Sequence, residues 1–392
     1  MKKKYAAPVT IEKLVFGGYG LAHTDSGVIF VEQSAPGDRV TVEGCGKRGG
    51  VPVGKITSFV QQSALRRKAP CRYAGLCGGC DWQHLHYPAQ VEAKRMIYEE
   101  CLKRIGRIET IPELEVYQSP EFGYRSRVQL KVDREHSALG FFRRQSNDVV
   151  AIRQCPLLSG GLHSLLQNPS DILEKLPADC HQIKAIEGDN ARVASYPVLD
   201  NLTCPQTSRA ISGITFTLDG DGFFQSNRFL LEKLGNWVRK AGKGTFFIDM
   251  YGGTGFFASH AAHQFESGVL VENITALSRK AEQTFSRNGF SHIKTETLSA
   301  ETFFKKRHYS AYRNPDCLIV DPPRPGLTRV VREGIRDLAP RKILYISCNP
   351  STQARDMGFF LNKCGYHLEN LALFDLYPQT HHIETAALLK LA

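Results

Sequence analysis

Residues 245–255 read TFFIDMYGGTG, and this stretch decides the fold class that the sequence predicts. Its first four residues form a short, mostly apolar run typical of a buried strand, and the glycines that follow are typical of a tight turn into a helix. Similar patterns continue along the chain, with strand candidates at 269–271, 317–320 and 343–346 and helical candidates that include 275–285 and 352–363. Because strand and helix alternate, residues 216–392 are expected to form an α/β domain with a parallel sheet between two layers of helices.

The glycine turn itself predicts an adenosine-containing ligand. Asp249 to Gly255 follows the first strand of this domain, and Glu272 ends the next one. Ligands of open α/β sheets bind beyond the carboxyl ends of the strands, where glycine lets the backbone approach and a carboxylate can accept hydrogen bonds from ribose hydroxyls. Only one Gly-x-Gly pair is present, Gly253 and Gly255, so the pattern favours S-adenosylmethionine over a dinucleotide. A purely conformational need for glycine in the turn is the alternative.

Two further strands end in residues that can do chemistry. Asp321-Pro-Pro-Arg324 follows the strand 317–320, and Ser347-Cys348-Asn349-Pro350 follows the strand 343–346. In many methyltransferases that act on exocyclic amines, an aromatic residue follows Asp-Pro-Pro and stacks on a flipped base, but here Arg324 takes that place. Since parallel strands end at one edge of a sheet, the thiol of Cys348 is expected to face the same crevice as the predicted cofactor.

A thiol in this crevice suits methylation of a pyrimidine at C5. Carbon 5 of uracil is too weakly nucleophilic to attack a sulfonium methyl group, so a thiolate must first add to C6, and Cys348 is the candidate. The C5 proton must then be removed by a base, for which Glu384 in the segment 378–384 is the candidate. Singly, such a Cys is more often a core residue and such a Glu a solvated one; their joint setting favours catalysis. Cytosine C5 is a second possible target, although it would be expected to require an acid for N3.

The N-terminal segment 1–61 is expected to be an OB-like β-barrel, because short alternating runs are separated by glycine-containing turns. The chain carries a net charge of +11, and residues 1–68 hold eleven Lys and Arg against five Asp and Glu. Such a balance favours a polyanionic partner, although a solvated surface is the simpler explanation. Phe16, Tyr19 and Phe30 are available for stacking on bases, or else belong to the barrel core.

The segment 62–215 has mixed strand and helix patterns and holds a cysteine-rich loop. Cys71, Cys77 and Cys80 stand in a glycine-rich stretch, and Cys155, which precedes a proline, is a possible fourth ligand. Four thiolates suit either zinc or a [4Fe–4S] cluster, and the triplet with a distant Cys-Pro leans towards iron and sulfur. Free thiols without a metal are the alternative. The six cysteines that are neither Cys348 nor candidate ligands are interpreted as packing residues.

Together, these residues resemble the RNA uridine-C5 methyltransferase family, in particular its cluster-containing ribosomal-RNA branch. The family motifs occur as Phe223-Phe-Gln225-Ser-Asn227, Asp249 to Gly255, Asp321 to Arg324, Ser347 to Pro350 and Pro378 to Glu384. The resemblance implies a TRAM domain at 1–61, a central RNA-binding domain at 62–215 and a class I, Rossmann-like methyltransferase domain at 216–392.

The resemblance also implies roles for individual residues. Cys348 would be the nucleophile and Glu384 the proton acceptor. The residues that would contact S-adenosylmethionine are Gln225, Tyr251, Glu272 and Asp321, and those that would ligate a [4Fe–4S] cluster are Cys71, Cys77, Cys80 and Cys155. The chain departs from the family pattern at Gly252, where Cys is common, and at Phe256 and Ser299, where relatives often have polar cofactor contacts.

The expected substrate is 23S ribosomal RNA, with transfer RNA as the alternative within the family. A non-catalytic RNA-binding protein or chaperone is the alternative from a different class, against which the intact Cys348 and Glu384 argue. No apolar run is long enough for a signal peptide or a membrane span, and the odd number of scattered cysteines favours reduced thiols. The sequence therefore predicts a cytoplasmic enzyme without membrane association, acting as a monomer.

Overall fold

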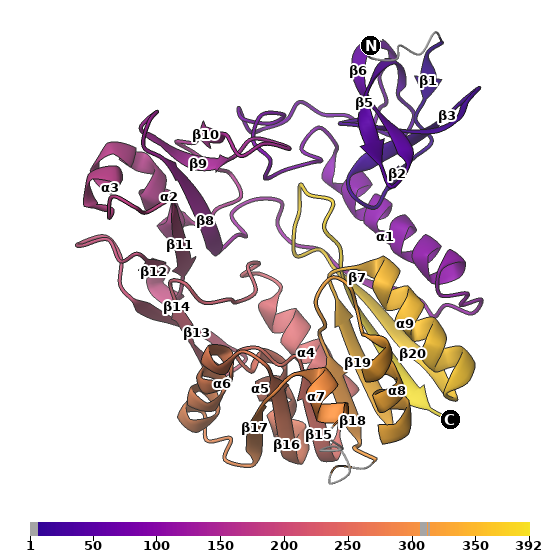
Figure 1. The fold of residues 1–392 in the computed structure, drawn as a ribbon, viewed down its shortest axis with the longest axis vertical. Coiled ribbons are helices and arrows are strands. Elements are labelled where there is room, and N and C mark those ends of the chain that lie inside the picture. The colour runs from indigo at the N-terminus through magenta and orange to yellow at the C-terminus, as the bar shows by residue number, and fades with distance from the viewer. Residues whose placement is uncertain (1–6, 306–311, 313) are drawn as a thin grey trace.

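The computed structural model describes residues 7–305, 312 and 314–392, which form a small N-terminal barrel, a central part and a large C-terminal α/β part (Figure 1). The central part and the barrel both lie at the end of the C-terminal part from which the loop after β20 projects (Figure 1). None of the described helices is both long and apolar enough to cross a bilayer.

The barrel is a six-stranded sheet in the order β1-β5-β6-β4-β3-β2 around a core that includes Ile29, Val31 and Val42. Its strands are β1 (Val9–Thr10), β2 (Lys13–Val15), β3 (Tyr19–Thr24), β4 (Gly27–Val31), β5 (Arg39–Arg48) and β6 (Val51–Gln61). Tyr19 is 7% exposed and stacks on Phe30 at 6.0 Å between ring centroids. The core interpretation therefore holds for Tyr19.

The central part begins with the cysteine loop and the long helix α1 (Tyr87–Arg104). A five-stranded antiparallel sheet follows, in the order β10-β9-β8-β11-β12. Its strands are β8 (Arg127–Asp133), β9 (Ala138–Phe142), β10 (Val149–Ala151), β11 (Gln182–Glu187) and β12 (Val193–Tyr196), with α2 (Gly160–Gln167), α3 (Pro169–Lys175) and a 3-10 turn, η1 (Asp189–Ala191), between them. The hairpin of β13 (Gln206–Ile211) and β14 (Ile214–Asp219) leads to the C-terminal part.

The C-terminal part is built on an eight-stranded sheet in the order β17-β16-β15-β18-β19-β21-β20-β7. Its strands are β15 (Gly244–Met250), β16 (Phe265–Glu272), β17 (Ile293–Thr297), β18 (Cys317–Val320), β19 (Lys342–Ser347), β20 (Tyr366–Phe374), β21 (Glu384–Leu391) and β7 (Leu114–Tyr117). β21 is antiparallel to both of its neighbours, and every other pair is parallel. The strand order reverses between β15 and β18, which marks the ligand crevice of an open α/β sheet.

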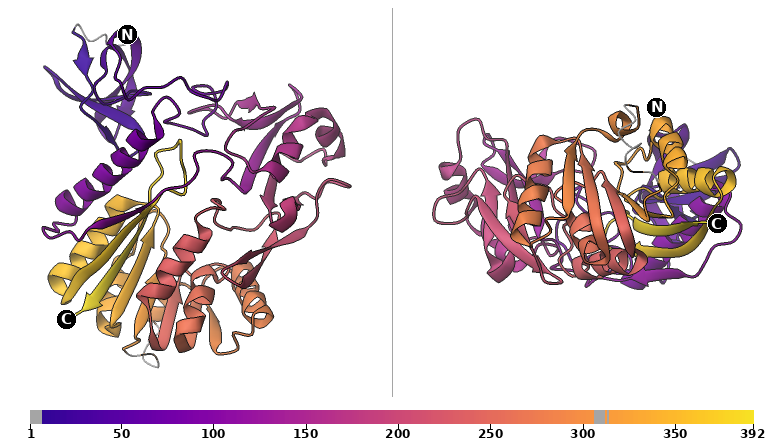
Figure 2. Two further views of the ribbon diagram at one scale, coloured as in Figure 1. Left: turned by 180° about the vertical axis from the view of Figure 1, so that it is seen from behind. Right: turned by 90° about the horizontal axis from the view of Figure 1, so that it is seen from below.

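Two helical layers cover this sheet because successive strand residues point to opposite faces (Figure 2). Ile248 and Met250 pack in one core, and Phe247 packs in the other. The first layer holds α7 (Ala300–Lys305), α8 (Arg329–Leu338), α9 (Pro350–Lys363) and α1, and the second holds α4 (Leu231–Ala241), α5 (Phe256–Ala261) with the 3-10 turn η2 (Ala262–Gln264), and α6 (Thr275–Arg287).

The expected fold class, an α/β class I domain with an OB-like barrel and a mixed central domain, is confirmed. The predicted strand 317–320 coincides with β18, and the predicted helix 352–363 lies within α9. Two central elements extend the C-terminal part beyond residues 216–392. β7 adds a strand at the edge of the sheet beside β20, and α1 packs against α9.

Candidate active site

One edge of the large sheet brings the candidate residues together. Tyr251 follows β15, Glu272 ends β16, Asp321 follows β18 and Cys348 follows β19. These four strands are parallel, so all four residues lie at the same edge. Glu384 begins the antiparallel β21 at that edge. The structure therefore gathers three of the four predicted cofactor contacts and the predicted catalytic pair around the point where the strand order reverses.

Cys348 and Glu384 stand opposite each other because of the register between β19 and β21. Ser347 faces Thr385 in this antiparallel ladder, and the next residues outward are Cys348 and Glu384. The Thr385 hydroxyl donates a hydrogen bond to the Ser347 carbonyl at 3.1 Å, which holds the two strand ends together. The side chains of facing residues in such a ladder lie close together.

The turn after Cys348 is held by its own hydrogen bonds. The side-chain oxygen of Asn349 accepts from the backbone N–H of Ser351 at 3.1 Å and caps α9, with Pro350 in the first helical turn. The Asn349 amide also donates to the Arg324 carbonyl at 2.9 Å. This bond links the loop after β18 to the loop after β19, so Asp321 and Cys348 are held as one unit.

The crevice is an environment that opposes negative charge. Burial and the nearby carboxyl groups of Glu384 and Asp321 raise the pKa of Cys348 to about 11, although the positive charge of Arg324 lowers it. Burial also raises the pKa of Asp321 to about 7. Burial and the charge of Asp321 raise the pKa of Glu384, which is 4% exposed. A negative charge on one of these three groups makes ionisation of the others less favourable. Such coupling is typical of residues that exchange protons during a reaction.

Tyr377 also faces this crevice, and the sequence analysis missed it. Burial raises the pKa of its phenol, and so do the charges of Glu384, Cys348 and Asp321. Its ring makes an edge contact with His382 at 5.7 Å between centroids. The sequence signal for Tyr377 is its position directly before the segment 378–384, which ends in Glu384.

The glycine loop after β15 has the backbone conformation that its sequence requires. Tyr251, Gly253 and Gly255 all have positive φ angles, of 63°, 55° and 83°. The Glu272 carboxylate accepts hydrogen bonds from the backbone N–H of Gly253 at 2.9 Å and of Ile274 at 2.8 Å. Glu272 therefore holds the loop in place in addition to its expected role towards the ribose. Gln225 lies before α4 and is 8% exposed.

Asp249 is a second residue that the sequence analysis quoted but assigned no role. One of its carboxylate oxygens accepts a hydrogen bond from the N–H of Ala258 at 2.9 Å in the first turns of α5. The other oxygen is buried and has no partner among the described residues. Burial raises the pKa of this carboxyl well above its usual range. This buried oxygen lies beside the crevice and could accept a hydrogen bond from a bound ligand.

The departures from the family pattern have local packing reasons. A Cβ atom at Gly252 would lie 2.5 Å from Cγ of Leu270, so the packing here excludes the common cysteine. Phe256 is 6% exposed and packs against Phe224, with 5.7 Å between ring centroids. Ser299 accepts a hydrogen bond from the N–H of Thr302 and belongs to the start of α7.

The four predicted cluster ligands line one largely apolar cavity in the central part. The N–H of Gly79 donates to the sulfur of Cys77 at 3.4 Å, and the Gln83 amide donates to the sulfur of Cys80 at 3.2 Å. Burial, together with the other three sulfurs, raises the pKa of Cys80 to about 12. Within the described part of the chain, however, no three His, Cys, Asp or Glu side chains gather closely enough to hold a single metal ion.

Known proteins resemble this chain over most of its length. The profile of the tRNA (Uracil-5-)-methyltransferase family matches residues 210–392. An uncharacterized RNA methyltransferase of Aquifex aeolicus is 31% identical, and the alignment covers 97% of this chain and 98% of that protein. The 23S rRNA (uracil(1939)-C(5))-methyltransferase RlmD of Thiobacillus denitrificans is 27% identical, with 97% of this chain and 99% of that protein covered.

A solved structure shares the fold. The tRNA (uracil-54, C5)-methyltransferase of Pyrococcus abyssi, crystallised with S-adenosyl-L-homocysteine, superimposes with a TM-score of 0.77 over 99% of this chain and 100% of that one, at 23% identity. One assignment accounts for the relatives that align over nearly the whole chain and for the matching family profile. It also accounts for the edge of the sheet where the thiol and the carboxylate meet. The chain belongs to the S-adenosylmethionine-dependent RNA uridine-C5 methyltransferase family, as its motifs indicated.

Proposed function

We propose that this enzyme methylates C5 of a uridine in 23S ribosomal RNA through a covalent bond between Cys348 and C6 of the base. The observation that carries the proposal is the register that sets Cys348 opposite Glu384 at the cofactor edge of the sheet. A nucleophile and a base on facing strand ends can reach the two adjacent ring carbons on which the reaction depends.

The chemistry proceeds in three steps. The thiolate of Cys348 adds to C6, and the electrons of the C5–C6 double bond move towards O4. Bound S-adenosylmethionine supplies an electrophilic methyl group, which C5 takes as the bond from methyl to sulfur breaks. Glu384 then removes the C5 proton, the C5–C6 double bond re-forms, and the thiolate of Cys348 leaves. The products are 5-methyluridine, S-adenosylhomocysteine and one proton.

The electrostatics of the crevice fit this order of events. Once deprotonated, a thiol with a pKa near 11 is a strong nucleophile, which suits its addition to C6. The raised pKa of Glu384 makes its carboxylate a stronger base than an exposed glutamate, which suits abstraction of a carbon-bound proton.

Gln225, Tyr251, Glu272 and Asp321 are proposed to hold S-adenosylmethionine. Three of them lie at the carboxyl ends of β15, β16 and β18, beside the reversal of strand order, where ligands of this fold class bind. The positive φ angles of the glycine loop and the unpartnered oxygen of Asp249 support a ligand at this place.

The cavity lined by Cys71, Cys77, Cys80 and Cys155 is proposed to hold a [4Fe–4S] cluster. Four thiols around a space, with N–H groups directed at two of the sulfurs, fit a cluster, which separates its ligands more widely than a single zinc ion does. Burial raises the pKa of Cys77 and Cys155, and the positive charge of Arg125 offsets part of this rise.

Ribosomal RNA is the preferred substrate because RlmD relatives align over nearly the whole of this chain. Transfer RNA is the alternative, supported by the solved structure that shares the fold. The exposed face of β8 offers a surface for either RNA. Lys131 lies 5.0 Å from the ring centre of Phe142, and Arg127 lies 5.5 Å from that of Phe223. Both rings are exposed, so charge and stacking surface occur together.

The covalent mechanism is tested by separating its steps. Cys348→Ala should bind RNA but form neither adduct nor product, because the bond to C6 cannot form. Glu384→Gln should add and methylate but fail to eliminate, so a protein–RNA adduct should accumulate on denaturing gels. RNA that contains 5-fluorouridine, which has no C5 proton, should trap the wild-type enzyme and not Cys348→Ala. Normal turnover by Glu384→Gln, or 5-methyluridine made by Cys348→Ala, would contradict the mechanism.

The substrate is tested by mapping 5-methyluridine with mass spectrometry in ribosomal and transfer RNA from a deletion strain. We expect a uridine in 23S ribosomal RNA to lose its methyl group and to regain it when the gene is restored. Loss confined to transfer RNA would replace the proposed substrate by the alternative.

A further inference from the structure

The loop 375–383 controls where Glu384 lies, because it joins the end of β20 to the first residue of β21. This loop also carries Tyr377 in the crevice. It rises from the sheet towards the segment between the barrel and α1, and it is the yellow loop in Figure 1. Most of its residues are buried, although they form neither helix nor strand. Its conformation therefore depends on side chains from other parts of the chain.

Lys94 of α1 holds the start of this loop. Its ammonium group lies 2.6 Å from the Asp375 carboxylate and donates to the Tyr377 carbonyl at 3.0 Å. The side chains of Lys94 and Asp375 are both 0% exposed. The ring of Trp82, 5.8 Å from the ammonium nitrogen, covers a further side. A buried ammonium thus has three favourable partners, two of which belong to the loop.

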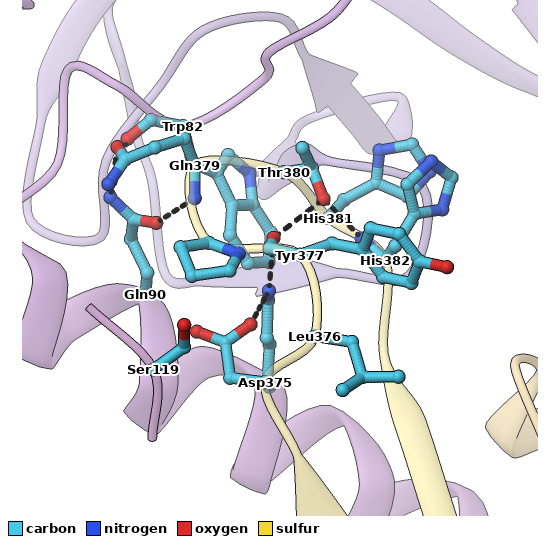
Figure 3. A network of polar contacts seen from close by, with 12 residues as sticks. Trp82, Gln90, Ser119, Asp375, Leu376, Tyr377, Gln379, Thr380, His381 and His382 are labelled. Atoms are coloured by element: carbon cyan, nitrogen blue, oxygen red, sulfur yellow. Dashed lines mark hydrogen bonds and ion pairs between the residues drawn. The ribbon is translucent and has the colours of Figure 1, made fainter. Parts of the chain in front are cut away.

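Gln90 of the same helix holds the middle of the loop. Its side-chain oxygen accepts from the N–H of Gln379 at 2.8 Å, and its amide donates to the Gln379 side chain at 2.9 Å. The same amide donates to the carbonyl of Trp82 at 3.1 Å, so the loop, α1 and the segment before α1 are joined (Figure 3). The loop is therefore shaped by α1, an element that precedes it by almost three hundred residues.

We propose that Lys94 is a positioning residue for the proton-abstraction step. It touches neither substrate nor reacting atoms, and it acts by fixing Asp375 and Tyr377 so that the chain enters β21 with Glu384 opposite Cys348. This inference rests on the proposed covalent mechanism and assigns to Lys94 a particular step within it.

The step-specific effect follows from where the contacts lie. Cys348 directly follows β19, and its neighbour Asn349 is hydrogen-bonded to Ser351 of α9 and to the Arg324 carbonyl, so the addition of the thiolate depends less on the loop. Glu384 is the residue directly after the loop. Displacement of a catalytic group by about 1 Å can lower the rate by about 10²-fold. Loss of Lys94 should therefore slow proton removal more than addition or methyl transfer.

The test compares Lys94→Met with a matched control, Lys280→Met. Lys280 of α6 also pairs with an aspartate, Asp219 at the end of β14, but lies outside the loop network. We expect Lys94→Met to lower kcat by about 10- to 100-fold and to accumulate the protein–RNA adduct. The KM for RNA should fall together with kcat, because the slowed step comes after adduct formation. Lys280→Met should show neither effect. A general loss of folding would not by itself accumulate adduct.

A second variant covers the case in which Lys94→Met does not fold, since an unpaired buried carboxylate is strongly destabilising. Lys94→Met combined with Asp375→Asn leaves no lone charge but still removes the bond to the Tyr377 carbonyl. This double variant should fold and should also accumulate adduct. Folded variants that turn over normally, or that slow without adduct, overturn the role of Lys94.

Glu384→Gln serves as the reference for the whole experiment. If it accumulates adduct and the Lys94 variants do not, the inference about Lys94 fails and the covalent mechanism stands. If Glu384→Gln turns over normally, the proposed mechanism itself fails, and the inference fails with it. The two failures are therefore distinguished by one set of denaturing gels.

Discussion

At the scale of single residues, burial and the charges around Cys348 together decide how readily its thiolate forms. Glu384 and Asp321 oppose the thiolate, and Arg324, on the loop after β18, favours it. Because the pKa of the thiol is raised to about 11, the thiolate is the minor form at neutral pH, and its fraction rises about tenfold with each pH unit up to that value. The rate of methyl transfer at RNA concentrations below KM should therefore rise as the pH increases above 7.

Arg324→Ala tests this electrostatic balance. Removal of the positive charge should raise the pKa of Cys348 further, so adduct formation at pH 7.5 should slow about two- to fivefold, a modest effect because Arg324 is exposed to solvent. A higher pH should restore the rate. Arg324→Lys keeps the charge and should behave almost as the wild type. Rates of adduct formation on 5-fluorouridine RNA at saturating RNA measure this, and equal losses in both variants would show that charge is not the cause.

At the scale of elements, the cysteine loop is directly hydrogen-bonded to the loop 375–383, which precedes Glu384. Asp81, which follows Cys80, and Trp82 both donate backbone hydrogen bonds to the Gln379 carbonyl, at 2.9 and 3.0 Å. The Asp81 carboxylate also lies 2.6 Å from the His381 ring. The cavity lined by the four cysteines is in the central part, but the cysteine loop helps to hold the residues that lead to Glu384.

Loss of one of the proposed cluster ligands should therefore loosen the loop 375–383. Protein purified without oxygen is expected to contain about four iron atoms per chain, and Cys80→Ser should lose them. In that variant, amide hydrogen exchange should speed up in the segment 379–383 as well as around the cavity. Cys364→Ser, at the end of α9, is the control and should leave both iron and exchange unchanged. Unchanged exchange at 379–383 in the iron-free variant would contradict the coupling.

At the scale of the whole molecule, charge governs the encounter with RNA. The chain carries a net charge of +11, and Lys and Arg contacts to phosphates release counterions. The logarithm of the RNA association constant should therefore fall linearly with the logarithm of the salt concentration. Lys131→Ala on β8 should reduce the slope by about 0.7 to 0.9, the value for one phosphate contact. Lys294→Ala, on the distant edge strand β17, should leave the slope unchanged in filter-binding titrations. Equal slopes for both variants would remove β8 from the RNA surface.

The sequence by itself determined the layered α/β part and the positions of its chemistry. The apolar run 317–320 became β18, because a strand buried on both faces needs consecutive apolar residues. The residues that follow such strands must meet at one edge, so Asp321 and Cys348 could be placed together without coordinates. The four cysteines could likewise be grouped, because their residue type and spacing are rare outside metal sites.

Only the tertiary structure decided how the catalytic edge is held. The pairing of Cys348 with Glu384 depends on β21 running antiparallel beside β19, a long-range register that no local pattern encodes. Lys94 gave no signal, since a lysine in a helix is usually exposed, whereas here it is fully buried against Asp375. β7 joined the sheet although it lies more than a hundred residues before the other strands. Local sequence specifies each element and what ends it, whereas pairing between distant elements depends on how their surfaces pack together.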